Sequence, residues 1–457
     1  MKTPKARGLF LALAVAAMCC GFPAPAGGYS VLSHESIVDS LWSSDIRVLL
    51  LKRFPSTTPD QLREAHAYAY GGCIIQDLGY YPFGNRFFSD LTHYVRTGDF
   101  VLALIRDSRD VNEYAFALGA LAHYTADNRG HPVAVNRSVP IVYPKLQTKF
   151  GNDVTFEDDP RAHVMVEFAF DVVQVAASGY VPSTYHDFIG FKVSRELLDR
   201  AFEETYGLNT SDVFRNENLA IETYRRSASE IIPQLTRVAW EKRKDEILKA
   251  DPQITRRGFE YHLSHRDYDR EWGHHHRSPN LLTWRMGLRR AEPDFLARFL
   301  VYLFQILPKI GPLRTLAFKV PTAQADQYFA SSYKETLAEY DAALKEAGTG
   351  PLKLKNEDLD TGKVTTRGEY RLADTTYGKW VDRLAKQSFA GAAPLVRGAI
   401  LSFYAQPAPV GESRKEAKRR KKTEQEVEVL KHLPSAVMGV AKETGEPSLA
   451  VPELPLH

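Results

Sequence analysis

The chain has 457 residues, three cysteines and a formal net charge of +3. This length is enough for two domains or for one large helical domain. Part of the charge comes from one basic run, Arg414 to Glu424. Without that run the chain is close to neutral, so bulk charge argues neither for nor against a nucleic-acid or anionic-membrane partner.

Residues 1–28 have the pattern of a secretory signal peptide. A basic start is followed by an apolar stretch, Leu9 to Met18, that is too short to span a bilayer. Small residues offer cleavage after Ala26 or after Gly28. We therefore expect a secreted or periplasmic protein.

The cysteines are consistent with export. Cys19 and Cys20 lie within the expected signal peptide, which leaves Cys73 alone in the mature chain. Because no intrachain disulfide can then form, we expect a bacterial type of exported protein that is held together by its core or by metal ions. Lipid anchoring at Cys19 or Cys20 is disfavoured, because Met18 stands where a small residue is expected.

The first part of the mature chain has a helical pattern with an aromatic loop inside it. Residues 29–53 predict a helix that carries His34. Taken alone, His34 is most simply interpreted as a surface residue in the first turn of this helix. Residues 59–100 predict helices on either side of a loop rich in aromatic residues, Gly and Pro. Asp77 and His93 stand at the two ends of that loop.

The stretch from Ala115 to Gly130 is the most informative part of the sequence. Its first half is apolar and rich in small residues, as in a buried helix, and His123, Asp127 and His131 follow at a spacing of four. Residues four apart lie on one face of a helix, and Pro132 is expected to end the helix at or near His131. Buried polar groups must be paired or must bind a metal. A metal site and a set of core histidines hydrogen-bonded to backbone and to Asp127 are both compatible with this stretch.

A second apolar helix carries a similar pair. Residues 136–159 predict a loop, and the helix after it begins at Asp158 or Asp159 as the capping residue. His163 and Glu167 are again four residues apart on this helix. Two such pairs, with further ligand-type residues on separate elements, favour a multinuclear zinc site, since imidazole and carboxylate are ligands that zinc prefers after thiolate.

The rest of the chain is helical by pattern but carries no recognisable motif. Residues 251–280 are polar and irregular, so His274, His275 and His276 are interpreted as an exposed loop. Residues 293–313 predict a buried helix, with an interfacial, membrane-touching helix as the alternative. From Pro407 the composition predicts disorder.

Together these patterns predict an all-α protein with little or no sheet. The expected organisation is a signal peptide over residues 1–28, a helical domain over 29–250, a helical extension of unknown role over 251–406 and a disordered basic, Pro-rich tail over 407–457. The role of the last two segments and the oligomeric state stay open.

The order and spacing of the ligand-type residues resemble the zinc-dependent phospholipase C family. That family shares its all-helical fold with single-strand-specific fungal nucleases and with the GPI-specific phospholipase D group. The resemblance covers about residues 29–180. The residues that carry it are Tyr29, His34, Asp77, His93, His123, Asp127, His131, His163 and Glu167.

The resemblance implies three zinc ions. The first would be held by Asp77, His93, His123 and Asp127. The second would be held by His131, His163 and Glu167. The third would be held by the amine and carbonyl of Tyr29 as the mature N-terminal residue, by His34 and by Asp127 as a bridge.

Two features depart from the family pattern. Tyr29 replaces the usual Trp, although the ligating groups there are backbone atoms. Only three residues separate Asp127 from His131, a gap that is longer in the secreted phospholipases C and nucleases and is closer to that of the phospholipase D group. The second departure leaves the substrate open.

The resemblance implies phosphodiester hydrolysis by a zinc-bound hydroxide, with Asp77 orienting the nucleophile or acting as general base. One expected substrate is a phospholipid, reached by transient contact with a membrane surface, for which Phe83, Phe87 and Phe88 would offer apolar area. A nuclease on the same metal core is an alternative, with Tyr80 and Tyr81 as stacking platforms for bases. A third hypothesis is an exported protein whose zinc ions only hold the helices together.

Overall fold

The computed structural model describes residues 30–175, 191–228, 232–250, 252, 255–256, 318–411 and 413–434. The signal peptide, Tyr29, the three consecutive histidines from His274 and the segment 293–313 lie outside the described residues. In the described part the only strands are two of two residues each, and nearly all other elements are helices. The prediction of an all-α fold is therefore confirmed.

Helices follow one another closely in the first part of the chain. They are α2 (Val31–Leu41), η1 (Trp42–Ile46), α3 (Arg47–Arg53), α4 (Pro59–Gly72), η2 (Ile75–Tyr80), α5 (Arg86–Tyr94), α6 (Thr97–Asp107), α7 (Val111–Arg129) and η3 (Gly130–Val135). They continue with α8 (Asn136–Val142), α9 (Pro144–Phe150), α10 (Pro160–Ala169), η4 (Phe170–Val175), α11 (Arg195–Tyr206), α12 (Thr210–Val213), α13 (Glu217–Arg226) and α14 (Ile232–Ala250). Of the η elements, η2 is a 3₁₀ helix and the others are π-helical turns.

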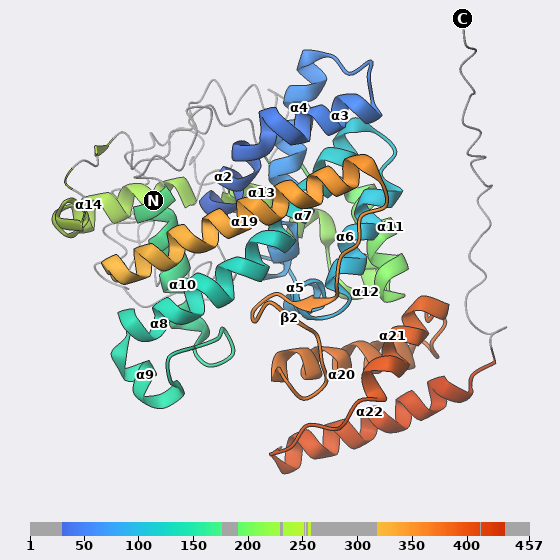
Figure 1. Ribbon diagram of the computed structural model, residues 1–457. Coiled ribbons are helices and arrows are strands. Elements are labelled where there is room, and N and C mark those ends of the chain that lie inside the picture. Colours follow the sequence, from blue (N-terminus) through green and yellow to red (C-terminus); the bar gives the residue numbers. More distant parts are fainter. Residues whose placement is uncertain are drawn as a thin grey trace, which may run out of the picture.

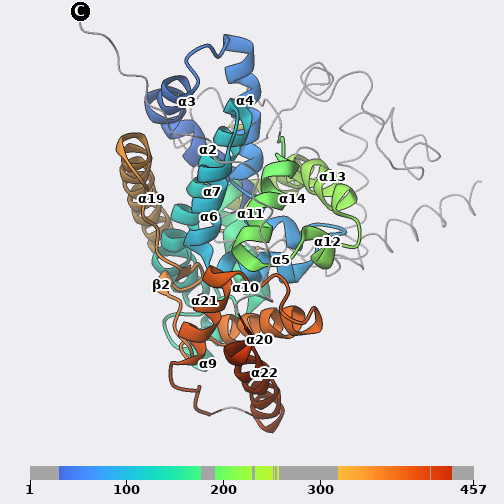
Figure 2. The ribbon, with the colours of Figure 1, turned by 90° about the vertical axis from the view of Figure 1, so that its right-hand side faces the viewer.

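The last part of the described chain has a long helix, a hairpin and three further helices. These are α19 (Ala323–Thr349), the antiparallel pair β1 (Glu357–Asp358) and β2 (Lys363–Val364), α20 (Arg371–Lys386), α21 (Pro394–Tyr404) and α22 (Arg414–His432). Figure 1 shows α19 crossing the helices of the first part, with α20, α21 and α22 below them. Figure 2 shows α19 along one side of α7 and α6.

Helix α7 is the central element of the core. It is buried along almost its whole length, as expected for a helix that is apolar on every side. Two glycines let α4 and α7 pass with backbones in close contact. A Cβ atom on Gly119 would lie 2.1 Å from the carbonyl oxygen of Ala69, and one on Gly72 would lie 2.0 Å from that of Phe116. This close packing holds the end of α4, and hence the loop with Asp77, against α7.

The chain does not leave the helical path after α7, which corrects two predictions. Pro132 does not end the helix at His131, because the π-helical turn η3 carries the chain on into α8. A wider turn changes the hydrogen-bond register, so the missing N–H of proline is tolerated there. Residues 136–159, expected as a loop, contain α8 and α9. Asp159 caps α10, with Oδ1 accepting from the Ala162 N–H at 2.9 Å.

The prediction of disorder from Pro407 is wrong for residues 414–432, which form α22. Ser413 and Glu416 form a capping box at its start. Arg420 and Glu424 pair one turn apart at 2.9 Å, and Leu430 is fully buried. The basic composition indicated a solvated chain, whereas the helix is stabilised by its cap and by one apolar stripe. The domain boundaries stay a prediction, although α19 packs on α2, α7 and η3 within one shared core.

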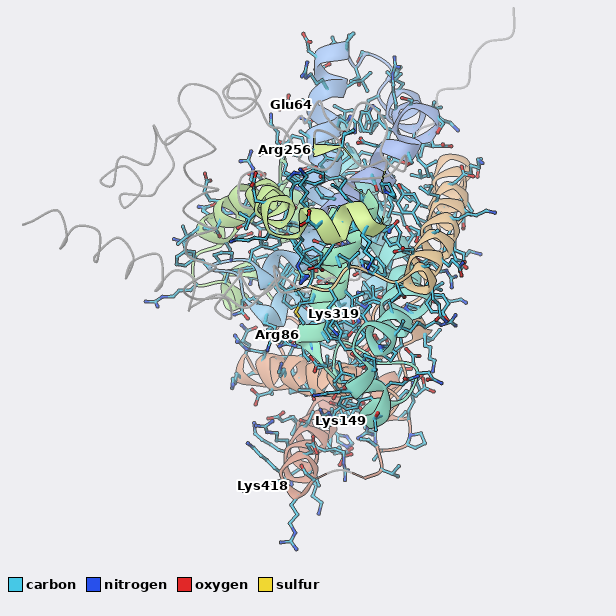
Figure 3. The ribbon with its side chains drawn as sticks, turned by 90° about the vertical axis from the view of Figure 1, so that its left-hand side faces the viewer. Glu64, Arg86, Lys149, Arg256, Lys319 and Lys418 are labelled. Carbon is cyan, nitrogen blue, oxygen red and sulfur yellow. The ribbon has the colours of Figure 1, made fainter. Side chains whose placement is uncertain are left out.

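Charged side chains lie on the outside of this bundle. Glu64, Lys149 and Lys418 are exposed, and in Figure 3 the Lys418 side chain points away from the end of α22. None of the helices in the described residues is both long enough and apolar enough to span a membrane.

Candidate metal centre

Eight of the nine predicted ligands lie in the described residues, and all eight side chains are buried. They come from six elements, namely α7, η3 and the four elements α2, η2, α5 and α10. These residues are His34 on α2, Asp77 on η2, His93 on α5, His123 and Asp127 on α7, His131 on η3, and His163 and Glu167 on α10. Tyr29, the ninth, lies outside the described part.

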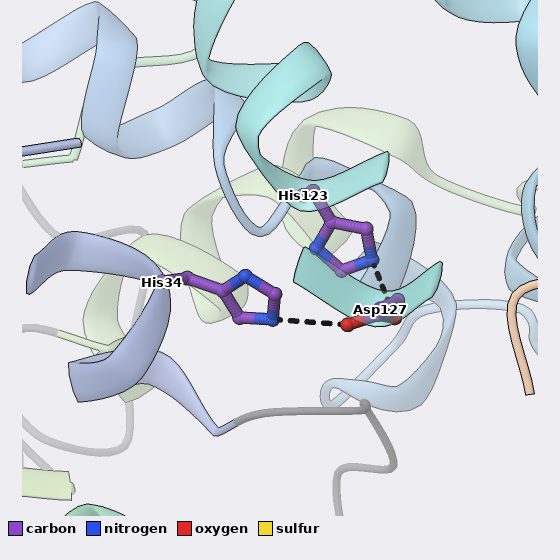
Figure 4. Close-up of side chains that lie close together, drawn as sticks. All are labelled: His34, His123 and Asp127. Atoms are coloured by element: carbon purple, nitrogen blue, oxygen red, sulfur yellow. Dashed lines mark ion pairs between the residues drawn. The ribbon is translucent and has the colours of Figure 1, made fainter. Parts of the chain in front are cut away.

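Asp127 stands between three imidazoles. Its Oδ1 lies 3.5 Å from Nε2 of His34, and its Oδ2 lies 3.1 Å from Nε2 of His123 and 3.4 Å from Nε2 of His93. Figure 4 shows His34 and His123 approaching this carboxylate from α2 and α7. The two oxygens thus face different imidazoles, as a bridging carboxylate would require.

Asp77 joins the same cluster from the other side. Its Oδ1 lies 3.3 Å from Nε2 of His93, which is 3.4 Å from Nε2 of His123. In both rings the other nitrogen, Nδ1, lies near a backbone carbonyl oxygen. Nδ1 of His93 is 2.8 Å from the carbonyl oxygen of Ser89, and Nδ1 of His123 is 3.0 Å from the carbonyl oxygen of Cys73. A carbonyl oxygen accepts only from a protonated nitrogen, so both rings present Nε2 as the lone-pair atom.

A third group lies at the junction of η3 and α10. Nδ1 of His163 is 2.6 Å from Oε1 of Glu167, and the rings of His131 and His163 meet edge to face at 4.9 Å between centroids. The i, i+4 spacing places Glu167 beside His163, as predicted, and the π-turn brings His131 to them.

Three groups in the described residues could each hold a metal ion, with ligand atoms within 4.8 Å of one another in each group. The groups are His34, His123 and Asp127; Asp77, His93 and His123; and His131, His163 and Glu167. The first two groups share His123, whose one free nitrogen can bind a single ion, so a second neighbouring ion would depend on Asp127 as a bridge. The group of His131, His163 and Glu167 has the members that the resemblance implied. The other two groups differ, because His123 also stands with His34 and Asp127, whereas the resemblance implied His34 with Asp127 and without His123.

The electrostatics of the cluster favour neutral imidazoles at two positions. Burial, with a smaller contribution from His123, lowers the pKa of His34 to about 3. Burial likewise lowers the pKa of His163 to about 4. Both rings are then uncharged at neutral pH, which is the form that binds a metal ion.

His93 and Asp127 show the opposite behaviour. Although burial alone would lower it, hydrogen bonding to Asp127 and to Asp77 raises the pKa of His93 well above its usual range. Although burial alone would raise it, His123 and His93 hold the pKa of Asp127 well below its usual range. Without a metal the carboxylate charge is thus balanced by a proton on an imidazole, and a bound cation would displace that proton.

The donor set fits zinc. The Asp127 side chain is fully buried, and its two oxygens face only imidazole nitrogens at 3.1 to 3.5 Å. Two ligands that are each about 2.1 Å from one tetrahedral ion lie about 3.4 Å apart. The separations around Asp127 and His93, from 3.1 to 3.5 Å, match this value. A bound cation would compensate the buried carboxylate charge in place of the imidazole proton.

Sequence reasoning missed two residues at the third group. Asp360, in the turn between β1 and β2, has Oδ1 2.9 Å from Nδ1 of His131. Asn136, at the start of α8, has Oδ1 2.8 Å from Nε2 of His163. Neither position carries a spacing signal, because Asp360 belongs to a remote polar stretch and Asn136 to a segment read as a loop.

An aromatic wall lies beside the cluster. Tyr80 contacts His93 with ring centroids 5.9 Å apart, and Phe156 contacts His163 at 5.7 Å. Tyr80 and Phe156 also contact each other at 6.4 Å. The wall therefore runs from the group with Asp77 to the group with Glu167.

Comparison with known proteins shows a similarity that covers part of the chain. Residues 33–216 match the family model described as zinc dependent phospholipase C. A search of curated proteins and a search of solved structures found no match. The matched residues include all eight described ligand candidates and the helices that carry them. This helical region, residues 33–216, is therefore similar to the zinc-dependent phospholipase C family.

Proposed function

We propose that the protein is an exported zinc-dependent phosphodiesterase of the phospholipase C type, with a phospholipid as substrate. One observation carries the hydrolase proposal. Asp127 faces the imidazole of His34 with one oxygen and those of His93 and His123 with the other. Neighbouring metal ions on a shared carboxylate are the arrangement used for in-line displacement at phosphorus.

When bound, zinc ions would supply Lewis acidity and lower the pKa of a bound water molecule towards roughly 7. The chain itself supplies position and proton acceptance. The side chain of Asp77 is 7% exposed, whereas those of Asp127 and Glu167 are 0% and 2% exposed. Asp77 is thus the carboxylate of the predicted set that is nearest to solvent, which supports its role in orienting the attacking water or accepting its proton.

The choice of a phospholipid rests on the family and on the aromatic residues. Phe83 is 58% exposed and offers apolar surface for transient contact with a membrane surface, whereas Phe87 and Phe88 belong to the core. Tyr80 and Tyr81 are 3% and 4% exposed. They present no open face for stacking a base, which disfavours the nuclease alternative.

The experiment is metal analysis combined with three assays on the purified protein. Zinc content by mass spectrometry tests the metal centre. Hydrolysis is then measured on phosphatidylcholine vesicles, on single-stranded DNA and on a chromogenic phosphodiester. We expect up to three zinc ions per chain and phosphate-ester release from the vesicles. Bound zinc without hydrolysis of any substrate would support the structural role, and cleavage of DNA alone would support the nuclease.

Export is tested separately. The full chain is expressed with its own N-terminus in a Gram-negative host, and the first residue of the processed protein is sequenced. We propose Tyr29 as the new N-terminal residue, which would supply its amine to the third zinc ion. Retention of residues 1–28 in the cytoplasm would refute both parts of this proposal.

A further inference from the structure

A segment outside the family match reaches the metal centre. The turn between β1 and β2 packs against α5, where the Leu359 N–H donates to the carbonyl oxygen of His93 at 3.0 Å. Asp360, the next residue, is 2% exposed. The matched region ends at residue 216, so this contact brings a remote part of the chain onto a predicted ligand helix.

The Asp360 carboxylate is held at both oxygens. Its Oδ2 accepts hydrogen bonds from the hydroxyl groups of Tyr94 at 2.9 Å and Tyr370 at 2.5 Å. Its Oδ1 is thereby directed to Nδ1 of His131, 2.9 Å away. The carboxylate therefore has a defined orientation that does not depend on His131.

The main chain of the same residue supports the second histidine of the group. The carbonyl oxygen of Asp360 accepts from Nδ2 of Asn136 at 2.9 Å, and Oδ1 of Asn136 lies 2.8 Å from Nε2 of His163. Asp360 thus contacts His131 with its carboxylate, and it contacts His163 indirectly through the side-chain amide of Asn136.

The other nitrogen of His131 is left for a metal. Neither ring nitrogen of His131 has a well-aligned hydrogen bond among the described residues, although the ring is only 2% exposed. Nδ1 lies within 2.9 Å of the Asp360 carboxylate as an ion pair, and Nε2 has no such neighbour in the described part of the chain. Histidine ligands of zinc commonly direct their second nitrogen to a carboxylate, which fixes the tautomer and the ring orientation. We propose that Asp360 is a positioning residue of the metal centre, which holds Nδ1 of His131 so that Nε2 binds the zinc ion of the group with His163 and Glu167. This inference rests on the proposed zinc-dependent function.

The chain offers a matched control. Asp39 is a buried carboxylate whose Oδ1 lies 2.9 Å from Nε2 of His66 and accepts from the Tyr70 hydroxyl at 2.5 Å. This is the same combination of carboxylate, imidazole and phenol, but none of the three residues belongs to a candidate metal group. Asp360→Asn and Asp39→Asn therefore make the same chemical change next to a candidate metal group and away from one.

The test measures zinc affinity by competition with a chromophoric chelator, on both variants and on the unchanged protein. Loss of a group that orients a zinc ligand typically weakens binding 10–100-fold. We expect this loss for one zinc ion in Asp360→Asn and less than a threefold change in Asp39→Asn. The visible spectrum of the cobalt-loaded protein should change only in Asp360→Asn. Equal zinc affinity and an unchanged cobalt spectrum in Asp360→Asn would overturn the proposal.

A second measurement keeps the proposal testable if Asp360→Asn does not fold. Nitrogen-15 spectra of the histidine rings in the unchanged zinc-loaded protein report which ring nitrogen is protonated. A His131 signal with a proton on Nδ1 and metal on Nε2 is expected, and the reverse tautomer would refute the role of Asp360. If the unchanged protein binds no zinc at all, the proposed function fails. If it binds zinc normally and Asp360→Asn does too, only this inference fails.

Discussion

Replacing Asp127 by asparagine is expected to disturb two metal groups at once. The carboxylate faces His34 with Oδ1 and faces His93 and His123 with Oδ2. An amide has the same shape, but it carries no charge and offers a single oxygen. Whichever way the amide is turned, one side of the bridge receives an NH₂ group, which cannot bind a cation.

The size of the effect follows from the position of this carboxylate between two metal groups. Removing a residue that only orients a zinc ligand costs about 10–100-fold in affinity, and 100-fold corresponds to about 2.7 kcal/mol. Loss of a charged ligand that serves two ions should exceed this value at each of them. By comparison, Glu167→Gln removes a ligand from the group with His131 and His163 alone. We therefore expect Asp127→Asn to release more zinc than Glu167→Gln.

The assay combines zinc content by mass spectrometry with hydrolysis of a chromogenic phosphodiester. Asp159→Asn is the control, because Asp159 caps α10 through the Ala162 N–H and faces no metal group. Asparagine is also a good capping residue, so this change should cost at most about 1 kcal/mol of stability and leave the zinc in place. A full zinc complement with normal turnover in Asp127→Asn would show that this cluster is not the active site.

Three further outcomes are expected. Removal of zinc with a chelator should lower the melting temperature in scanning calorimetry, because a ligand at a thousand times its dissociation constant stabilises the folded state by about 4 kcal/mol. An unchanged melting temperature would argue against zinc in the native protein. Gly119→Ala should cost about 1–3 kcal/mol in urea unfolding, because its Cβ would overlap the carbonyl oxygen of Ala69. Gly398→Ala, on α21 with open space around it, should instead stabilise by about 1 kcal/mol, and equal effects of the two changes would contradict the packing of α4 on α7. Burial raises the pKa of Asp171 from 3.8 in the unfolded chain to about 6 in the folded protein. The protonated carboxyl group therefore stabilises the fold fully below pH 3.8, and this contribution is lost as the pH rises through 6. The free energy of unfolding of the unchanged protein should therefore fall by roughly 2.5 kcal/mol relative to Asp171→Asn between pH 4 and 7. A constant difference across that range would refute this.

Most of the fold could be predicted from local patterns. Apolar and small residues on every side of α7 indicated a buried helix, and the structure has one from Val111 to Arg129. Spacings of four placed His123 beside Asp127 and His163 beside Glu167, because a helix sets those neighbours without help from the rest of the chain.

The wrong predictions share one cause. Each rested on local composition alone and left out the helices that pack against the segment. The basic run in α22 suggested a solvated tail, but Leu430 is buried against neighbouring helices. Pro132 suggested a helix end, but the π-turn η3 keeps the chain against α19 and α10. In both places tertiary contacts outweigh a local preference of a few kcal/mol at most.

By itself, therefore, the sequence determined the helical class, the identity of the ligand-type residues and the two i, i+4 pairs. Only the tertiary structure decided which residues share a group, because His34, Asp77 and His93 come from three elements whose approach to α7 depends on close backbone packing. It alone brought Asp360 to His131, since that contact joins segments far apart in the chain and leaves no periodic trace in either. Helical spacing is a property of neighbouring residues, whereas the composition of a buried polar cluster depends on how the whole core closes around it.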